Sequence, residues 1–272
     1  MHELLLYGQV PSGRHDQVLK ILAGVAAMQP TRILQRCIVY KPVREPEEPG
    51  LNVRRGGTQN IAVKQQAKPA TAAAALYYTK LVQKLTDEDF GKKDANTLSA
   101  DVKDGDDSKW SMRWEDIPDT GDRGVSIRFT NTTDLLSGNP HTHMLAAGPN
   151  RFVTEYFVEG HRVVLGNVVV FLHRLLHEPG VRNLEEAPRT NLPAFSALQL
   201  FDASGAYILE AKVRVQDFKD ANILESGVNE LKEFQKQMAG CVGLSLPDRL
   251  ALDTRVKYKP PQAIASTLNR PR

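Results

Sequence analysis

The first residues of chemical interest are three charged side chains in one extended stretch. In residues 208–215, ILEAKVRV, the charged residues Glu210, Lys212 and Arg214 occupy every second position. A strand with this spacing projects all three side chains from one face, because side chains alternate between the two faces of a strand. A carboxylate beside two bases can hold a phosphorylated substrate, or it can be the solvated face of a sheet. The stretch by itself leaves both interpretations open.

A catalytic metal site needs more carboxylates than this stretch supplies. Mg²⁺ and Mn²⁺ prefer several hard oxygen ligands, and the triphosphate tunnel enzymes provide them as Glu-x-Glu pairs on strands near both ends of the chain. Here Lys212 follows two residues after the glutamate, and Leu5 follows Glu3 at the same spacing. The pair Glu45 and Glu47 lies in a proline-rich segment. We therefore expect no metal site and no metal-dependent hydrolysis.

Four histidines could be proposed as zinc ligands. His141 and His143 lie in NPHTHM, and His173 and His177 are four residues apart. On a helix the second pair would share one face, but the valine-rich residues before it favour a strand, where residues four apart are roughly 13 Å apart. No HExxH motif is present. We interpret all four as core or surface histidines.

Nucleophilic catalysis is not indicated either. Cys37 lies in an apolar strand candidate, Cys241 is far away in the sequence, and there is no CxxC, GxSxG or P-loop motif. A reactive thiol needs an electropositive, accessible environment that lowers its pKa. The sequence assigns no catalytic residue, no cofactor, no metal ligand and no individual partner-binding residue.

Aromatic side chains near arginines raise the alternative of single-stranded nucleic acid binding, which uses aromatic rings as stacking platforms. The residues concerned are Trp110, Trp114, Tyr156, Phe157, Arg113, Arg123 and Arg128. The same alternation is typical of a half-buried strand, and Glu115, Asp116 and Asp119 dilute the basic charge. A net charge of +3 over 272 residues is also small for a dedicated nucleic-acid binder. This function and a divergent tunnel-type phosphohydrolase remain the alternatives.

The first part of the chain predicts a strand, a helix and a second strand. Residues 4–10 and 33–40 are the strands, and Ser12 is the expected N-cap of a helix that ends before Gln29-Pro30. The three further segments are a loop over 42–75, a strand or a helix over 76–85, and an acidic insertion over 86–109 that we expect to be disordered.

The second part predicts hairpins followed by a helix and a last strand. The expected hairpins are 111–119 with 124–131, a run of β segments over 151–178 broken at 159–160 and 166–167, and 195–201 with 207–215. After Ser226, apolar residues recur at helical spacing up to Met238, and Gly240 is the expected C-cap. Residues 250–256 form the expected last strand, and 257–272 a mobile basic tail.

Together these elements predict a mainly β (α+β) protein with one many-stranded antiparallel barrel and at least two packed helices. A length of 272 residues fits a single barrel domain, here over 1–256. Hydrophobic residues at 41% and charged residues at 25% are the balance of a globular protein. There is no apolar run of roughly 18 residues and no signal-peptide pattern, so we expect an intracellular protein with no membrane partner.

The order of several segments resembles a known family. These segments are MHELLLYG, LYYTKLVQKL before the acidic insertion, WSMRWEDIPD, VEGHRVVLGNVVVFLHRLL, LEAKVRVQD and NELKEFQKQMAGCVGLSLPDRLALDTRV. They resemble subunit eighteen of the Mediator complex in its filamentous-fungal form, and VEGHRVVLGNVVVFLHRLL is the most distinctive of them. The match covers roughly two-thirds of the chain.

The resemblance implies a barrel related to the triphosphate tunnel enzymes without their activity. It also implies a structural role in the Mediator head module, which couples transcription regulators and activators to RNA polymerase II in the nucleus. The implied partners are Mediator subunit twenty, as a heterodimer, a C-terminal helix of subunit eight, and RNA polymerase II within the larger assembly. No direct sequence-specific contact with nucleic acid is implied.

Overall fold

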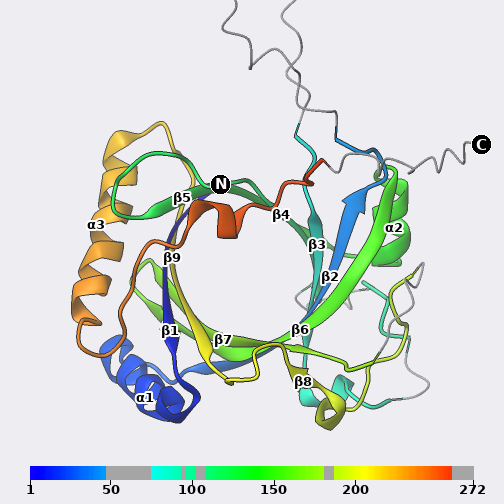
Figure 1. Cartoon of the computed structure of the whole chain (residues 1–272), viewed down its shortest axis with the longest axis horizontal. Helices are drawn as coiled ribbons and strands as arrows, with labels where there is room; N and C mark the ends of the chain where they lie inside the picture. Colours follow the sequence, from blue (N-terminus) through cyan, green and yellow to red (C-terminus); the bar gives the residue numbers. More distant parts are fainter. Residues whose placement is uncertain (47–74, 93–95, 102–107, 181–186, 259–272) are drawn as a thin grey trace, which may run out of the picture.

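The computed structural model describes residues 1–46, 75–92, 96–101, 108–180 and 187–258. Among these residues, a nine-stranded antiparallel sheet closes into a barrel with helices on its outside (Figure 1). The strands are β1 His2–Val10, β2 Thr31–Pro42, β3 Thr79–Leu85, β4 Trp110–Glu115, β5 Ser126–Leu135, β6 Asn150–Leu165, β7 Val168–His177, β8 Gln199–Leu200 and β9 Tyr207–Val215. The α-helices are α1 His15–Ala26, α2 Pro140–Ala146 and α3 Ala221–Gln237.

Eight of the strands form the closed ring. Their order is β6-β2-β3-β4-β5-β1-β9-β7, and pairing of β6 with β7 completes the circle. The short strand β8 pairs with the end of β7. All these pairings are antiparallel, so the prediction of a mainly β, many-stranded antiparallel barrel is confirmed.

The first strand closes the barrel with a strand from the last third of the chain. Along β1, Leu4 faces Ile127 of β5 on one side and Val213 of β9 on the other. Nine residue pairs connect β1 to β9, from His2↔Val215 to Val10↔Tyr207. The barrel is therefore held by contacts between residues about two hundred positions apart in the sequence.

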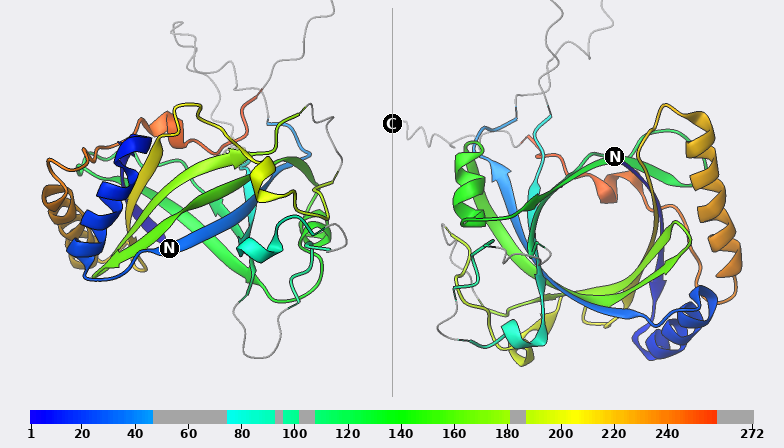
Figure 2. Two further views of the ribbon diagram at one scale, coloured as in Figure 1. Left: turned by 90° about the horizontal axis from the view of Figure 1, so that it is seen from below. Right: turned by 180° about the vertical axis from the view of Figure 1, so that it is seen from behind.

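The main apolar core lies outside the ring, between the barrel wall and two helices. Leu209 and Val213 of β9 belong to one buried cluster with Val228, Leu231 and Phe234 of α3. Burial of each such side chain contributes roughly 1.5–3 kcal/mol, so this helix stabilises the wall it covers. Figure 2 shows α1 and α3 on one side of the barrel and α2 on the opposite side.

A second apolar cluster covers the opposite wall and corrects one prediction. Leu98 and Ala100 are buried beside Trp110, and the Trp110 Nε1 donates a hydrogen bond to the Ser99 carbonyl at 3.0 Å. The expected disorder over 86–109 is therefore wrong for 96–101, because Leu98 and Ala100 pack against Trp110 and anchor this polar segment. Asp87–Asp89 forms a 3₁₀ turn. Residues 93–95 and 102–107 lie outside the described residues.

The hairpin predictions have mixed outcomes. β4 pairs with β5, and β6 with β7 across a turn in which Gly166 has φ +57°. The expected break at 159–160 is wrong, because β6 runs through it. The hairpin of 195–201 with 207–215 is also wrong: Phe195–Ala197 is a 3₁₀ turn, and both β8 and β9 pair with β7 instead.

Helix ends and the last predicted strand need correction too. Ser12–Arg14 is a 3₁₀ turn, so α1 starts at His15 and Ser12 is not its N-cap. The last helix starts five residues before Ser226, because the Asp220 side chain accepts hydrogen bonds from Asn222 and Ile223 and caps it there. The expected strand 250–256 is a 3₁₀ turn at Arg249–Leu252 followed by a single bridge at Arg255.

Several predictions concern residues that the structure covers only in part. Of the loop 42–75, residues 47–74 lie outside the described residues, as do 259–272 of the tail. The ambiguous segment 76–85 is a strand over Thr79–Leu85. In the described part of the chain, no helix is both long and apolar enough to cross a membrane.

Candidate site in the barrel lumen

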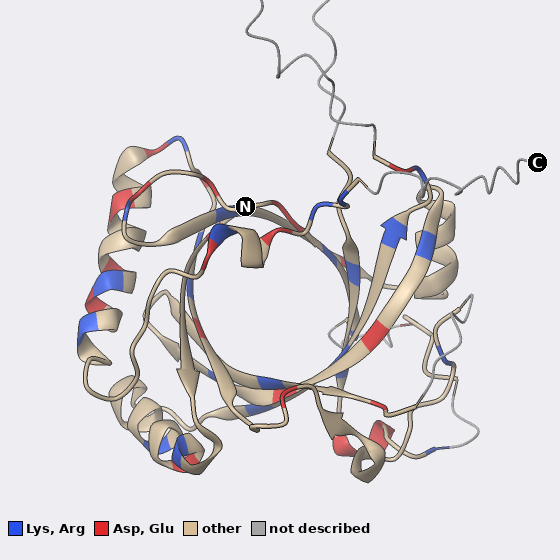
Figure 3. Cartoon of the chain, in the orientation of Figure 1, with Lys and Arg blue, Asp and Glu red and all other residues tan. Residues whose placement is uncertain are grey.

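The barrel encloses a cavity of about 330 Å³ that is lined by side chains from seven of the eight ring strands, all except β1. Figure 3 shows basic and acidic positions on the strands around the ring. The charged residues that line the cavity are Lys80, Arg113, Glu115, Arg128, Arg162, Glu210, Lys212 and Arg214. This lumen is the candidate functional site.

The three charged residues of β9 face the lumen. Their apolar neighbours Leu209, Ala211 and Val213 face the outer core, as strand alternation requires. The Lys212 Nζ donates to a Glu210 carboxylate oxygen at 2.9 Å, and the Tyr7 hydroxyl donates to the other oxygen at 3.3 Å. Burial raises the pKa of Glu210, but the attraction of Lys212 outweighs it and brings that pKa to about 2.

Glu3 joins the lumen network, although its partners are distant in the sequence. Strand register places it between Arg214 of β9 and Arg128 of β5. Its carboxylate, fully buried, accepts hydrogen bonds from Arg113 at 2.7 Å, Arg128 at 3.3 Å and Arg214 at 3.3 Å. The run Leu4-Leu5-Leu6 after Glu3 does not alternate, so the sequence carries no signal that this side chain faces the lumen.

Glu115 has a similar role on the neighbouring strands. It contacts Arg113 at 2.7 Å, Arg128 at 3.0 Å and Lys80 at 3.2 Å. Burial raises the pKa of Glu115, and these three cations outweigh that effect and hold it well below its usual range. Glu3 and Glu115 are thus each surrounded by three cations.

This arrangement opposes a divalent cation. Each lumen carboxylate is already engaged by basic side chains, and the same side chains would repel Mg²⁺ or Mn²⁺. The part of the chain that the structure describes contains no group of three or more His, Cys, Asp or Glu residues that could hold a metal ion. What the lumen can do chemically is attract an anion.

The structure does not bring the four histidines together. His173 and His177 lie on strand β7, as predicted, and burial lowers the pKa of His173. His141 and His143 lie on helix α2, where the His141 Nδ1 is 2.8 Å from the Tyr40 hydroxyl. Asn139 caps this helix and Pro140 begins it, a helix-start pattern that is visible in the sequence.

The two cysteines and the aromatic residues are also separated. Cys37 lines the lumen, and burial raises its pKa to about 11, so it is protonated at neutral pH and is a poor nucleophile. Trp110 and Phe157 lie in two different outer clusters, whereas Tyr156 faces the lumen. The aromatic side chains therefore form no common stacking surface among the described residues.

The fold and the lumen define a class: a closed antiparallel barrel whose inward carboxylates are bound by basic side chains, with no metal-binding group among the described residues. A family model described as Med18 protein matches residues 2–255. The chain therefore belongs to the Med18 family, subunit 18 of the Mediator complex of RNA polymerase II transcription.

Similar proteins from filamentous fungi support this assignment. Mediator of RNA polymerase II transcription subunit 18 from Aspergillus niger is 34% identical over 94% of this chain and 100% of its own length. The Aspergillus fumigatus protein of the same name is 35% identical with the same coverage. A chain in the structure of the Schizosaccharomyces pombe Mediator head module aligns with a TM-score of 0.60 at 18% identity, over 91% of this chain and 99% of that one.

Family membership gives the general role. The chain is a non-catalytic subunit of Mediator and acts in transcription by RNA polymerase II in the nucleus. The prediction of the family and the prediction that the protein is not an enzyme are both confirmed.

Proposed function

We propose that this chain is a scaffold subunit of the Mediator head module, which holds other subunits in place and thereby couples transcription regulators to RNA polymerase II. The observation that carries the proposal is a closed barrel whose lumen carboxylates are each paired with basic side chains. Such a body offers a rigid outer surface, and the similar fold in the S. pombe head module supports the placement.

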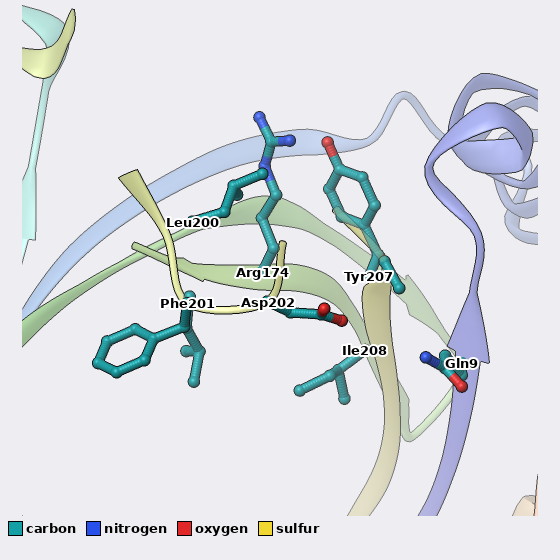
Figure 4. Close-up of a pocket in the computed structure, with 9 residues that line it drawn as sticks. Gln9, Arg174, Leu200, Phe201, Asp202, Tyr207 and Ile208 are labelled. Carbon is teal, nitrogen blue, oxygen red and sulfur yellow. The ribbon is translucent and has the colours of Figure 1, made fainter. Parts of the chain in front are cut away.

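We infer that its direct partners are Mediator subunit twenty, as a heterodimer, and a C-terminal helix of subunit eight. A small, mostly apolar pocket of about 100 Å³ lies at the end of the barrel, between β8 and the start of β9 (Figure 4). Phe201 and Ile208 line it and are 58% and 38% exposed. One aliphatic side chain of a helix fits a pocket of this size, and a buried anchor is typical of helix-in-groove recognition.

Co-expression tests the heterodimer. The full chain and subunit twenty should elute together in size-exclusion chromatography, and elution as two separate monomers would contradict the proposal.

A Phe201→Ser variant tests the pocket. It should bind the subunit eight helix at least about tenfold more weakly, since loss of an anchor costs more than about 1.4 kcal/mol. The matched control is Leu145→Ser, on α2, where Leu145 is 48% exposed. Equal affinities of both variants would exclude the pocket as the helix site.

We also infer a distant relationship to the triphosphate tunnel fold, supported by the closed antiparallel barrel with inward charges. The family role and the pairing of the lumen carboxylates with cations give no support to retained hydrolysis. Incubation with tripolyphosphate and Mn²⁺ should release no phosphate, and hydrolysis that disappears in Glu210→Ala would overturn this part of the proposal.

A further inference from the structure

The lumen carries more positive than negative charge. Six basic side chains line it, Lys80, Arg113, Arg128, Arg162, Lys212 and Arg214, against the two lining carboxylates Glu115 and Glu210 and the adjoining Glu3. In the described residues this leaves an excess of three positive charges. We propose that the lumen is a metal-independent binding site for a small polyphosphate anion.

The basic side chains are concentrated on one wall. Along β9, β1 and β5, the register places Arg214, Glu3 and Arg128 side by side. On the neighbouring strands β3 and β4, Lys80 and Arg113 face each other. Four cations on this wall share two carboxylates, so an anion that contacts the wall meets net positive charge.

Several donors on these residues have no acceptor in the described part of the chain. The Arg128 Nε is buried without a hydrogen-bond partner, and the Arg128 side chain is 5% exposed. Arg214 donates through Nε to Glu3 and has its two Nη groups left over. Phosphate oxygens match such guanidinium donors, often in pairs.

Arg162 supplies a further cation from a different strand. It lies on β6 in the same register row as Phe171 of β7 and Glu210 of β9. Its side chain makes no hydrogen bond or ion pair with the described residues, and the residue is exposed. The charge of this arginine is therefore not neutralised by a neighbouring carboxylate among the described residues.

The volume of the lumen cavity limits the ligand to a small molecule. A cavity of about 330 Å³ is at the lower end of the range for small-molecule sites, roughly 300–1,000 Å³. A lumen with low-dielectric walls also concentrates the field of its charges. Multiple negative charges on a few atoms, as in a triphosphate chain, match this combination of volume and charge.

The test is calorimetric titration of the full chain with inorganic tripolyphosphate in the presence of a chelator. We expect saturable binding that weakens as the salt concentration rises, because the attraction is electrostatic. A parallel titration with ATP distinguishes the source of the phosphate: tighter binding of ATP indicates a nucleotide, and tighter binding of tripolyphosphate a base-free anion. Either result supports the site.

Two variants with opposite charge effects locate the binding. Arg162→Gln, which has no ion pair to lose, should weaken tripolyphosphate binding about tenfold, the effect of a lost contact of about 1.4 kcal/mol. Glu210→Gln should tighten it several-fold, because Lys212 then becomes available. The matched control is Lys236→Gln on α3, where the lysine side chain is 76% exposed, and it should bind like the parent.

Three results would overturn the proposal. They are no saturable binding of either phosphate compound, binding that requires Mn²⁺ or Mg²⁺, and an equal loss of affinity in Arg162→Gln and Lys236→Gln. Stronger binding of an acidic peptide than of tripolyphosphate would also overturn it, because the occupant would then be a protein segment. None of these results bears on the scaffold function, which the partner assays test separately.

Discussion

Replacement of Glu3 by glutamine should destabilise the whole barrel. Glu3 is fully buried and binds Arg113, Arg128 and Arg214. Glutamine has nearly the same shape, so the change removes the negative charge and turns an amide donor toward guanidinium groups. Removal of one partner from a buried ion pair costs roughly 3–5 kcal/mol.

The exposure of the three arginines places the expected cost at the low end of that range. The side chains of Arg113 and Arg214 are 16% and 48% exposed and can rehydrate, whereas that of Arg128 is 5% exposed and cannot. We therefore expect a loss of about 3 kcal/mol in the free energy of unfolding. At about 2–4 °C per kcal/mol for a chain of this size class, Tm should fall by roughly 6–12 °C.

Urea unfolding followed by circular dichroism measures this loss. The control is Glu233→Gln, whose exposed pair with Lys236 on α3 is worth less than about 1 kcal/mol. The double variant Glu3→Gln, Arg128→Met should recover part of the loss, because it also removes the most desolvated cation. A Glu3→Gln variant as stable as the control would refute the reasoning that this network holds the barrel together.

Three further changes test other parts of the structure. Glu210 has a pKa of about 2 in the folded chain against an ordinary 4.5. About 3 kcal/mol of stability is therefore present above pH 4.5 and is lost as pH falls toward 2. The free energy of unfolding should fall less steeply with decreasing pH in Glu210→Gln than in the parent, and identical curves would contradict this. Gly160→Ala should lower the free energy of unfolding in urea by about 3 kcal/mol, because the added Cβ would lie 2.4 Å from a carbonyl oxygen of β7. The control Gly24→Ala on α1 has open space around it and should be neutral or stabilising. Maleimide should label the partly exposed Cys241 before the buried Cys37, whose pKa is about 11. Mass spectrometry of the labelled peptides measures the order, and earlier labelling of Cys37 would contradict the prediction.

Local patterns in the sequence predicted the strands of the barrel but not all of its pairings. The alternation in 207–215 identified both faces of β9, and the β-branched run over 151–178 identified β6 and β7. The turn before β9 suggested a hairpin with 195–201, yet β7 is the strand that pairs with both β8 and β9. Turn chemistry is local, whereas strand order depends on where the whole sheet closes.

The candidate site was predicted in part for the same reason. Alternation correctly placed Glu210, Lys212 and Arg214 on one face. Their environment depends on Glu3, which the sequence separates from Arg214 by more than two hundred residues and the barrel register places directly opposite. No spacing rule connects two strands so far apart, so the ion network could not be assembled from sequence alone.

The buried segment 96–101 illustrates a different limit. Its composition is polar, and composition predicted disorder. Leu98 and Ala100 nevertheless fill a space between Trp110 and Met144. A few apolar side chains order a short segment when a neighbouring surface already provides the complementary shape, and that surface is invisible in the composition.

The position of β1 between β5 and β9 also has a consequence for synthesis of the protein on the ribosome. At about 5–20 residues per second, the partner strand β9 emerges roughly 10–40 s after β1, since Val10 pairs with Tyr207. During this interval one edge of an apolar strand lacks its neighbour and is exposed to other nascent chains. Cellular folding helpers that bind extended apolar segments are therefore expected to act on this chain until its ring is complete.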